Sequence, residues 1–314
     1  MQLPGAVGSI CPTNSAILAR VNKRRNMQSD ESSQIRLDAV GKWSEVKLEI
    51  LGKYAQAYTT ILTNSSFPLS PVYVDGFAGA GQHESRQTGS IIDGSPKQAL
   101  DIKPPFSRLH FVDIDPGRVN ALRLMTAGRP EAKVWEGDCN QVLLEQVFPQ
   151  ELGSTKTRIL CFLDPYGLHL DWELFQRAGQ SGHVEIFLNF AVLDMERNVF
   201  RRNTEKVSER DLERMRRFWG DDSWKEIVYR RQEGLFEEME VKERGAADAI
   251  AKAFRERLKD RAGFGYVPEP VPMRNSRGGL LFYLFFAAPE TRGGRIGEKI
   301  VTDIFNKYRK EGVL

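Results

Sequence analysis

Short, uninterrupted apolar runs recur along the chain, and most are separated by stretches of helical composition. The runs are residues 72–74, 109–112, 133–136, 159–163, 184–190 and 280–286. Continuous rather than alternating hydrophobicity indicates strands that are covered on both faces. The last run follows a proline-rich segment and a glycine turn, which favours one antiparallel strand beside the others. The sequence therefore predicts an α/β fold with a doubly wound, mostly parallel sheet.

The remaining segments give the predicted domain organisation. Residues 1–40 mix Gly, Pro, Ser and Asn with a small basic cluster, so we expect a mobile N-terminal arm. Residues 41–314 are expected to form one domain, which begins with an amphipathic helix near residues 43–62. Residues 194–263 show no strand signal and contain charge-rich helical stretches. They are predicted to be a helical insertion in that domain.

Composition limits the class of protein. The 314 residues carry 45 basic and 42 acidic side chains, and the net charge of +3 is too small to indicate nucleic-acid binding by itself. The cysteines have no C-x-x-C spacing and the histidines no ligand spacing, so we expect reduced thiols and no metal site. No apolar stretch of about 18 residues and no secretory signal pattern is found. The sequence therefore predicts a cytoplasmic protein.

A glycine-rich loop follows the first predicted strand in the segment VYVDGFAGAG. Parallel α/β sheets bind ligands beyond the carboxyl ends of their strands, and Gly79 and Gly81 would let the backbone approach one closely. The third glycine of a dinucleotide fingerprint is missing, which disfavours NAD. The loop resembles motif I of class I methyltransferases, which implies that Asp75, Phe77 and the two glycines contact the amino-acid end of S-adenosylmethionine.

The next two predicted strands also end in acidic residues. Asp113 directly follows its apolar run and is expected to bind the ribose hydroxyls of the cofactor. Asp115, before a proline, is expected to cap a helix. Asp138 suits either a contact with the adenine amine or a helix cap. Three strand ends with acids in this order predict a Rossmann-like class I methyltransferase sheet that binds S-adenosylmethionine.

The fourth predicted strand ends in Asp164, Pro165 and Tyr166. This segment is similar to the D-P-P-Y motif of enzymes that methylate exocyclic amines of nucleobases, although the second proline is missing. Asp164 would accept the hydrogens of the amine, Pro165 would stiffen the loop, and Tyr166 would stack on the base. The alternative is a turn that only shapes the cofactor pocket. Asn189 and Phe190, at the end of the fifth strand, suit a polar and stacking pair or ordinary sheet-end positions.

Several ordered segments together resemble the three-Cys-motif partner protein family, TcmP. They are EVKLEILGKYAQAYTTIL, VYVDGFAGAG, GSPKQAL, FVDID, FLDPYG, FLNF, FWGDDSW and GGLLFYLFFAAP. The resemblance runs from about residue 40 to the C terminus and implies a methyltransferase-like fold with a protein partner encoded nearby. The family's name refers to cysteines of that partner, and Cys11, Cys139 and Cys161 are not that motif. The resemblance does not settle the methyl acceptor.

The predicted insertion suggests one kind of acceptor. Residues 197–231 hold 11 basic and 7 acidic side chains interspersed with aromatic residues. Such a segment suits a phosphate backbone, although mixed charges on helices are more often a solvated, internally paired face. The sequence therefore predicts a methyltransferase that acts on an exocyclic amine of a nucleic-acid base. The alternatives are a methyltransferase of a partner protein or small molecule, and a non-catalytic module that binds the cofactor or a partner.

Overall fold

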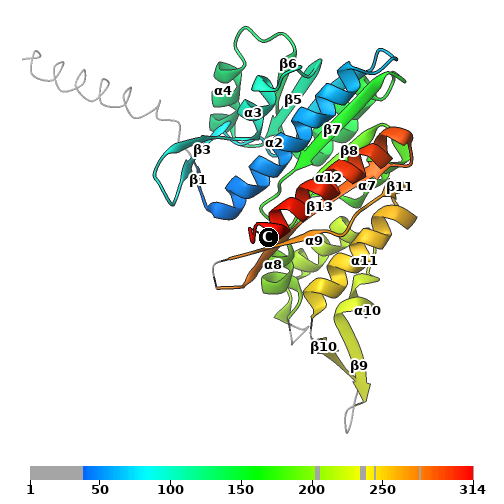
Figure 1. Ribbon diagram of the computed structural model, residues 1–314. Coiled ribbons are helices and arrows are strands. Elements are labelled where there is room, and N and C mark those ends of the chain that lie inside the picture. Colours follow the sequence, from blue (N-terminus) through cyan, green and yellow to red (C-terminus); the bar gives the residue numbers. More distant parts are fainter. Residues whose placement is uncertain (1–37, 202–205, 234–237, 244, 276, 314) are drawn as a thin grey trace, which may run out of the picture. The chain divides into compact units, whose positions relative to one another are not determined.

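The computed structural model describes residues 38–201, 206–233, 238–243, 245–275 and 277–313 (Figure 1). The predicted mobile arm over residues 1–40 falls almost entirely outside these ranges. Its last residues, Asp38–Val40, form strand β1. The predicted domain over residues 41–314 and its insertion can be followed in the described residues.

A sheet of eight strands forms the centre of the domain. In spatial order its main path is β6 (Ala132–Glu136), β5 (Arg108–Asp113), β2 (Ser70–Asp75), β7 (Thr157–Leu163), β8 (Val184–Phe190), β13 (Leu280–Pro289) and β11 (Phe264–Tyr266). The five strands from β6 to β8 are parallel, whereas β13 is antiparallel to β8. Strand β12 (Val271–Arg274) also pairs with β13. The predicted doubly wound, mostly parallel sheet is confirmed.

Neighbouring side chains of each central strand enter different cores. In β7, Cys161 and Leu163 belong to one buried cluster, and Leu160 and Phe162 belong to the other. Because both faces are covered, the strands contain continuous apolar runs. One cluster is closed by α2 (Lys42–Thr63), α3 (Ser95–Asp101), α4 (Pro116–Met125) and α12 (Arg292–Lys310), of which α2 and α12 lie side by side (Figure 1). The other is closed by helices 139–151, α7 (Trp172–Ser181) and the insertion.

A small sheet adjoins the glycine-rich loop. Directly after the loop, β3 (Gln82–Ser85) turns back into β4 (Ile91–Asp93), and β1 pairs with β3 in parallel. The amide of Gly94 donates to the carbonyl of Gly81 at 2.9 Å, which ties the end of this hairpin to the loop. The sequence analysis did not predict this sheet.

The insertion is mostly helical, as predicted, but it also contains a β-hairpin. Its elements are α8 (Val192–Asp194), the π-helix Met195–Val199, α9 (Glu209–Trp219), α10 (Trp224–Val228), β9 (Tyr229–Glu233), β10 (Glu238–Lys242) and α11 (Ala246–Asp260). The expectation of no strand between residues 194 and 263 is therefore wrong, because β9 and β10 pair antiparallel. Their sequences are mostly charged, and backbone hydrogen bonds form a two-stranded ribbon without an apolar run.

Aromatic packing holds the insertion against the sheet. The ring of Phe254 on α11 lies 4.9 Å from that of Phe190 on β8 and 5.2 Å from that of Phe218 on α9, between ring centroids. All three side chains are fully buried. Aromatic pairs at these distances add to the free energy of burial. Within the described ranges, no helix combines the length and apolar character that a membrane span requires.

Candidate functional site

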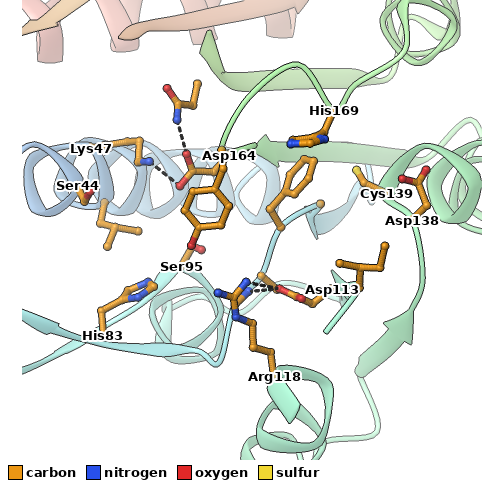
Figure 2. A pocket seen from close by; sticks show the side chains of 18 of the residues that line it. Ser44, Lys47, His83, Ser95, Asp113, Arg118, Asp138, Cys139, Asp164 and His169 are labelled. Atoms are coloured by element: carbon orange, nitrogen blue, oxygen red, sulfur yellow. Dashed lines mark hydrogen bonds and ion pairs between the residues drawn. The ribbon is translucent and has the colours of Figure 1, made fainter. Parts of the chain in front are cut away.

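A cavity of about 410 Å³ opens at the carboxyl ends of the parallel strands (Figure 2). It is lined by the loops that follow β2, β5, β6 and β7, by the end of β8, and by side chains from α2 and β13. Six residues predicted from the sequence line it: Phe77, Gly79, Asp113, Asp138, Asp164 and Tyr166. Of the other predicted residues, Asp75, Gly81 and Pro165 do not. The sheet thus brings most of the predicted site together.

The glycine-rich loop forms one wall through its backbone. Gly79 has a φ of +65°, a conformation that residues with a Cβ rarely adopt. At Gly76 an added Cβ would lie 2.7 Å from the sulfur of Cys139 and 2.9 Å from a methyl group of Leu163. The loop therefore needs glycine at both positions, in one case for the turn and in the other for close packing.

The Asp113 carboxylate organises this wall. Its Oδ2 accepts a hydrogen bond from the Gly79 amide at 2.9 Å, and its Oδ1 accepts from the Asp115 amide at 2.9 Å. The guanidinium of Arg118 lies 3.9 Å away. Each carboxylate oxygen has two lone pairs, so Asp113 can still accept hydrogen bonds from a ligand. The next residue, Ile114, also lines the cavity and is 70 % exposed, which offers an apolar surface that the sequence analysis missed.

Asp75 lies behind the loop rather than in the cavity wall. Its side chain is fully buried and accepts from the Phe77 amide at 3.3 Å and from the Tyr73 hydroxyl at 3.2 Å. Burial raises the pKa of Asp75 to about 7, against the opposing effect of a hydrogen bond from Ser95. Ser95 does line the cavity. A contact between Asp75 and a cofactor stays a prediction.

The two remaining strand-end acids cap helices. Asp115 accepts from the Arg118 amide at 2.9 Å at the start of α4, which confirms the predicted cap. Asp138 accepts from the amides of Asn140 and Gln141 at 3.0 and 3.2 Å, so the capping alternative holds for it too. Asp138 also lines the cavity. Its second predicted role, a contact with the adenine amine, stays a prediction.

The opposite wall contains an ion pair that the sequence analysis missed. Figure 2 shows the Lys47 ammonium and the Asp164 carboxylate pointing toward each other, with Nζ and Oδ2 2.5 Å apart. Asn189 donates to the other carboxylate oxygen at 2.7 Å. The Lys47 side chain is only 5 % exposed. The sequence contained a signal for a buried lysine. Lys47 lies three residues before Ile50 and four before Leu51, which places it on the apolar stripe of α2.

Two further groups face the cavity beside this pair. The Oδ1 of Asn189 is buried without a hydrogen-bond partner among the described residues, so it can accept from a bound molecule. Tyr166 is 75 % exposed at the rim, where its ring lies 5.9 Å from the Arg118 guanidinium. Pro165 is buried. Phe190 is fully buried in the core, which favours the sheet-end interpretation over stacking on a ligand.

The arginines of the insertion that the structure describes are largely paired within the protein. Arg214 binds Asp194 at 2.7 Å, and Arg217 binds Asp171 at 2.7 Å. Arg216 pairs with Glu213 and Asp222. This arrangement agrees with the alternative of an internally paired face. A nucleic-acid partner stays a prediction.

No metal centre is evident in the described part of the chain. It contains no group of three or more His, Cys, Asp or Glu side chains placed to hold an ion. Cys139 and Cys161 are buried free thiols, and burial raises the pKa of both. Such thiols are poor nucleophiles because the thiolate is the reactive form.

The structure is similar, at low identity, to several solved structures. A protein of the DUF519 family from Legionella pneumophila is 12 % identical, with 82 % of this chain and 91 % of that chain covered and a TM-score of 0.40. The N-methyltransferase NodS from Bradyrhizobium japonicum, in complex with S-adenosylhomocysteine, is 11 % identical, with 80 % and 89 % covered and a TM-score of 0.35. The N-terminal domain of EvdMO1 with the same ligand is 10 % identical, with 76 % and 79 % covered and a TM-score of 0.37.

These likenesses concern the fold alone, and their low scores carry no functional assignment. No family model matches the chain, and no curated protein is similar to it. The resemblance to the TcmP family therefore stays a prediction from the sequence motifs.

Proposed function

We propose that this protein is an S-adenosylmethionine-dependent methyltransferase. The observation that carries the proposal is the Asp113 carboxylate, which lies at the carboxyl end of β5 and holds the amide of Gly79 in the glycine loop. This pairing of a strand-end acid with a glycine turn occurs at the edge where parallel α/β sheets bind nucleotide-containing ligands. The adjoining cavity of about 410 Å³ is within the usual range for a cofactor site.

The wall formed by the glycine loop suits the cofactor. Asp113 would accept hydrogen bonds from the ribose hydroxyls, and the exposed Ile114 would cover one face of the adenine ring. Asp138, which also lines the cavity, would accept a hydrogen bond from the adenine amine, and Phe77 with Gly79 would flank the amino-acid end. When bound, the cofactor supplies a methyl group activated on a sulfonium ion. The chain's main task is then to align an acceptor with that methyl group and to exclude water.

The wall around Asp164 suits a methyl acceptor whose nitrogen carries two hydrogens, such as an exocyclic amine. The Asp164 carboxylate and the free Oδ1 of Asn189 are adjacent hydrogen-bond acceptors, because the Asn189 amide also donates to Asp164. Lys47 fixes the carboxylate from its other side. With the cofactor bound, its methyl group would be available to the amine nitrogen, and Asp164 would accept the proton that the nitrogen loses. Tyr166 at the rim would stack on a flat ring.

The exocyclic amine can belong to a nucleic acid, a protein or a small molecule. We favour a nucleobase of a nucleic acid because the exposed Tyr166 ring and the Asp164 segment combine stacking with amine recognition. The internal pairing of Arg214, Arg216 and Arg217 favours the alternative of a protein or small-molecule acceptor. The resemblance of the sequence to the TcmP family also implies a partner protein that is encoded nearby.

Two measurements, made one after the other, test the proposal. Calorimetry with S-adenosylmethionine and S-adenosylhomocysteine should show saturable binding to the full chain, and no binding would refute it. Transfer of labelled methyl groups to RNA, DNA, protein and metabolite fractions of a cell extract would then identify the acceptor class. Binding without transfer to any fraction would favour a non-catalytic module. For a nucleic-acid acceptor, the affinity should fall with salt as expected for several phosphate contacts.

A further inference from the structure

A second cavity, of about 240 Å³, lies at the other edge of the sheet, beside the amino ends of β7 and β8. Its walls come from α2, the starts of these two strands and the first turns of α12. Ile61, Leu62 and Ile300 supply apolar surface. The volume is below the roughly 300 Å³ at which pockets for drug-sized molecules begin, which suits a smaller ligand.

Two buried polar groups in this wall have unused hydrogen-bonding capacity. The hydroxyl of Tyr58, on a side chain that is 6 % exposed, has no hydrogen-bond partner among the described residues. Glu185 is 7 % exposed and accepts a hydrogen bond from the Tyr54 hydroxyl at 2.5 Å. A carboxylate can accept several more. An added Cβ at Gly297 would lie 2.4 Å from the Tyr54 oxygen, so this glycine makes room for the pair.

The environment of Glu185 favours a cationic neighbour. Burial raises the pKa of Glu185 to about 7, although the Tyr54 hydrogen bond and the charge of Arg158 oppose the shift. A buried carboxylate is stabilised by an opposite charge placed against it. A ligand ammonium group would therefore offset the cost of keeping Glu185 ionised.

The lining of the cavity also carries positive charge. The amino end of the 19-residue helix α12 reaches it with Arg292 and Gly293, and Arg158 approaches from β7. The amino end of a helix carries partial positive charge. Only the Thr291 hydroxyl, at 3.7 Å, is near the place where a Gly293 Cβ would lie, so a ligand can reach the backbone there.

We propose that this cavity binds a free aliphatic α-amino acid. Its ammonium group contacts Glu185, its carboxylate contacts the amino end of α12 and Arg158, and its side chain packs on Ile61, Leu62 and Ile300. The Tyr58 hydroxyl gains a hydrogen-bond partner from the bound polar end. A zwitterion fits because the lining combines one buried acid with the positive charge of Arg158 and of the amino end of α12, with apolar surface beside them. This inference is independent of the methyltransferase proposal, since the two cavities share no lining residue.

Calorimetry with L-leucine and two truncated analogues tests the charge arrangement. L-Leucine should bind the full chain with saturation, whereas 4-methylpentanoate and 3-methylbutylamine, which each lack one charged group, should bind about tenfold more weakly or worse. No binding of L-leucine overturns the proposal. Equal binding of either analogue also overturns it, because one of the two charge contacts would then be absent.

Two variants locate the binding. Tyr58→Phe removes only the hydroxyl and should weaken L-leucine binding by about fivefold or more. Ile61→Trp should block the cavity and abolish binding. Tyr308→Phe is the matched control, because that hydroxyl accepts from Lys53 at 2.7 Å and does not line the cavity. If L-leucine binds both cavity variants as it binds the unmodified chain, it occupies another place and the proposal fails.

Discussion

The two walls of the cavity at the carboxyl edge are built in different ways. The wall beside the glycine loop consists of backbone and of residues at the ends of β2, β5 and β6, which follow one another along the chain. The wall beside Asp164 joins side chains that are distant in sequence, with Lys47 separated from Asp164 by 117 positions. The first wall mainly provides shape, whereas the second wall mainly provides paired charge. Substitutions in the second wall should therefore have the larger effects.

The largest expected effect is on transfer in an Asp164→Asn variant. The amide keeps the shape of the side chain but cannot take a proton, so we expect the transfer rate to fall by about 100-fold or more. The affinity for S-adenosylmethionine, measured by calorimetry, should stay nearly unchanged because the other wall is intact. Asp222→Asn is a matched control, since Asp222 pairs with Arg216 away from the cavity. Full transfer by Asp164→Asn would remove Asp164 from the catalytic assignment.

Lys47→Met should cause the largest loss of stability. Removing one partner of a buried pair leaves an uncompensated charge, and we expect the free energy of unfolding to fall by about 3 kcal/mol. The Lys47 side chain is 5 % exposed and that of Asp164 is 27 % exposed, so water can relieve part of the cost. Urea denaturation measures the change.

A matched control lies on the same helix. Lys53 pairs with Glu49 at 2.8 Å on the surface, and Lys53→Met should cost less than about 1 kcal/mol. Combining Lys47→Met with Asp164→Asn should recover part of the loss, because the unpaired carboxylate is then gone. Equal losses for the two lysine variants would show that the Lys47 pair is no more important than a surface pair.

The difference between the two walls also explains which site residues the sequence could predict. Asp113 directly follows one apolar run and Gly79 lies in the loop after another, so a strand pattern alone places both at the same sheet edge. Lys47 lies on the apolar stripe of a helix, and only the packing of α2 against the central sheet brings it to Asp164. The pattern also could not show on which side of the loop Asp75 lies. It is buried behind the loop because its side chain bonds Tyr73 and the Phe77 amide.

Longer-range features were missed for a related reason. The hairpin of β9 and β10 depends on backbone pairing between charged segments, which leaves no hydrophobic signature. The cavity beside Glu185 depends on α12, which begins more than 100 residues after β8 in sequence. Local chain order predicted the fold and the wall beside the glycine loop, whereas tertiary packing determines the wall beside Asp164 and the second cavity.

Asp113→Ala tests the wall beside the glycine loop. The variant loses the bond to the Gly79 amide and the proposed ribose contacts, so S-adenosylmethionine should bind more weakly by about 1–3 kcal/mol. Calorimetry measures this as about a fivefold to 150-fold rise in Kd. Glu136→Ala is a suitable control, because Glu136 pairs with Asp113 in the register of β5 and β6 but does not line the cavity. An unchanged Kd for Asp113→Ala would refute the ribose assignment.

Asp115→Ala should have the smallest effect and separates binding from capping. Asp115 lies two residues after Asp113 and caps α4 through the Arg118 amide at 2.9 Å. Loss of an N-cap costs about 1 kcal/mol of stability, which a urea titration can detect. Its side chain does not line the cavity, so the Kd for S-adenosylmethionine should be that of the unmodified protein. If Asp115→Ala weakens binding as much as Asp113→Ala does, the effect of Asp113 comes from the local fold of this segment rather than from a direct contact.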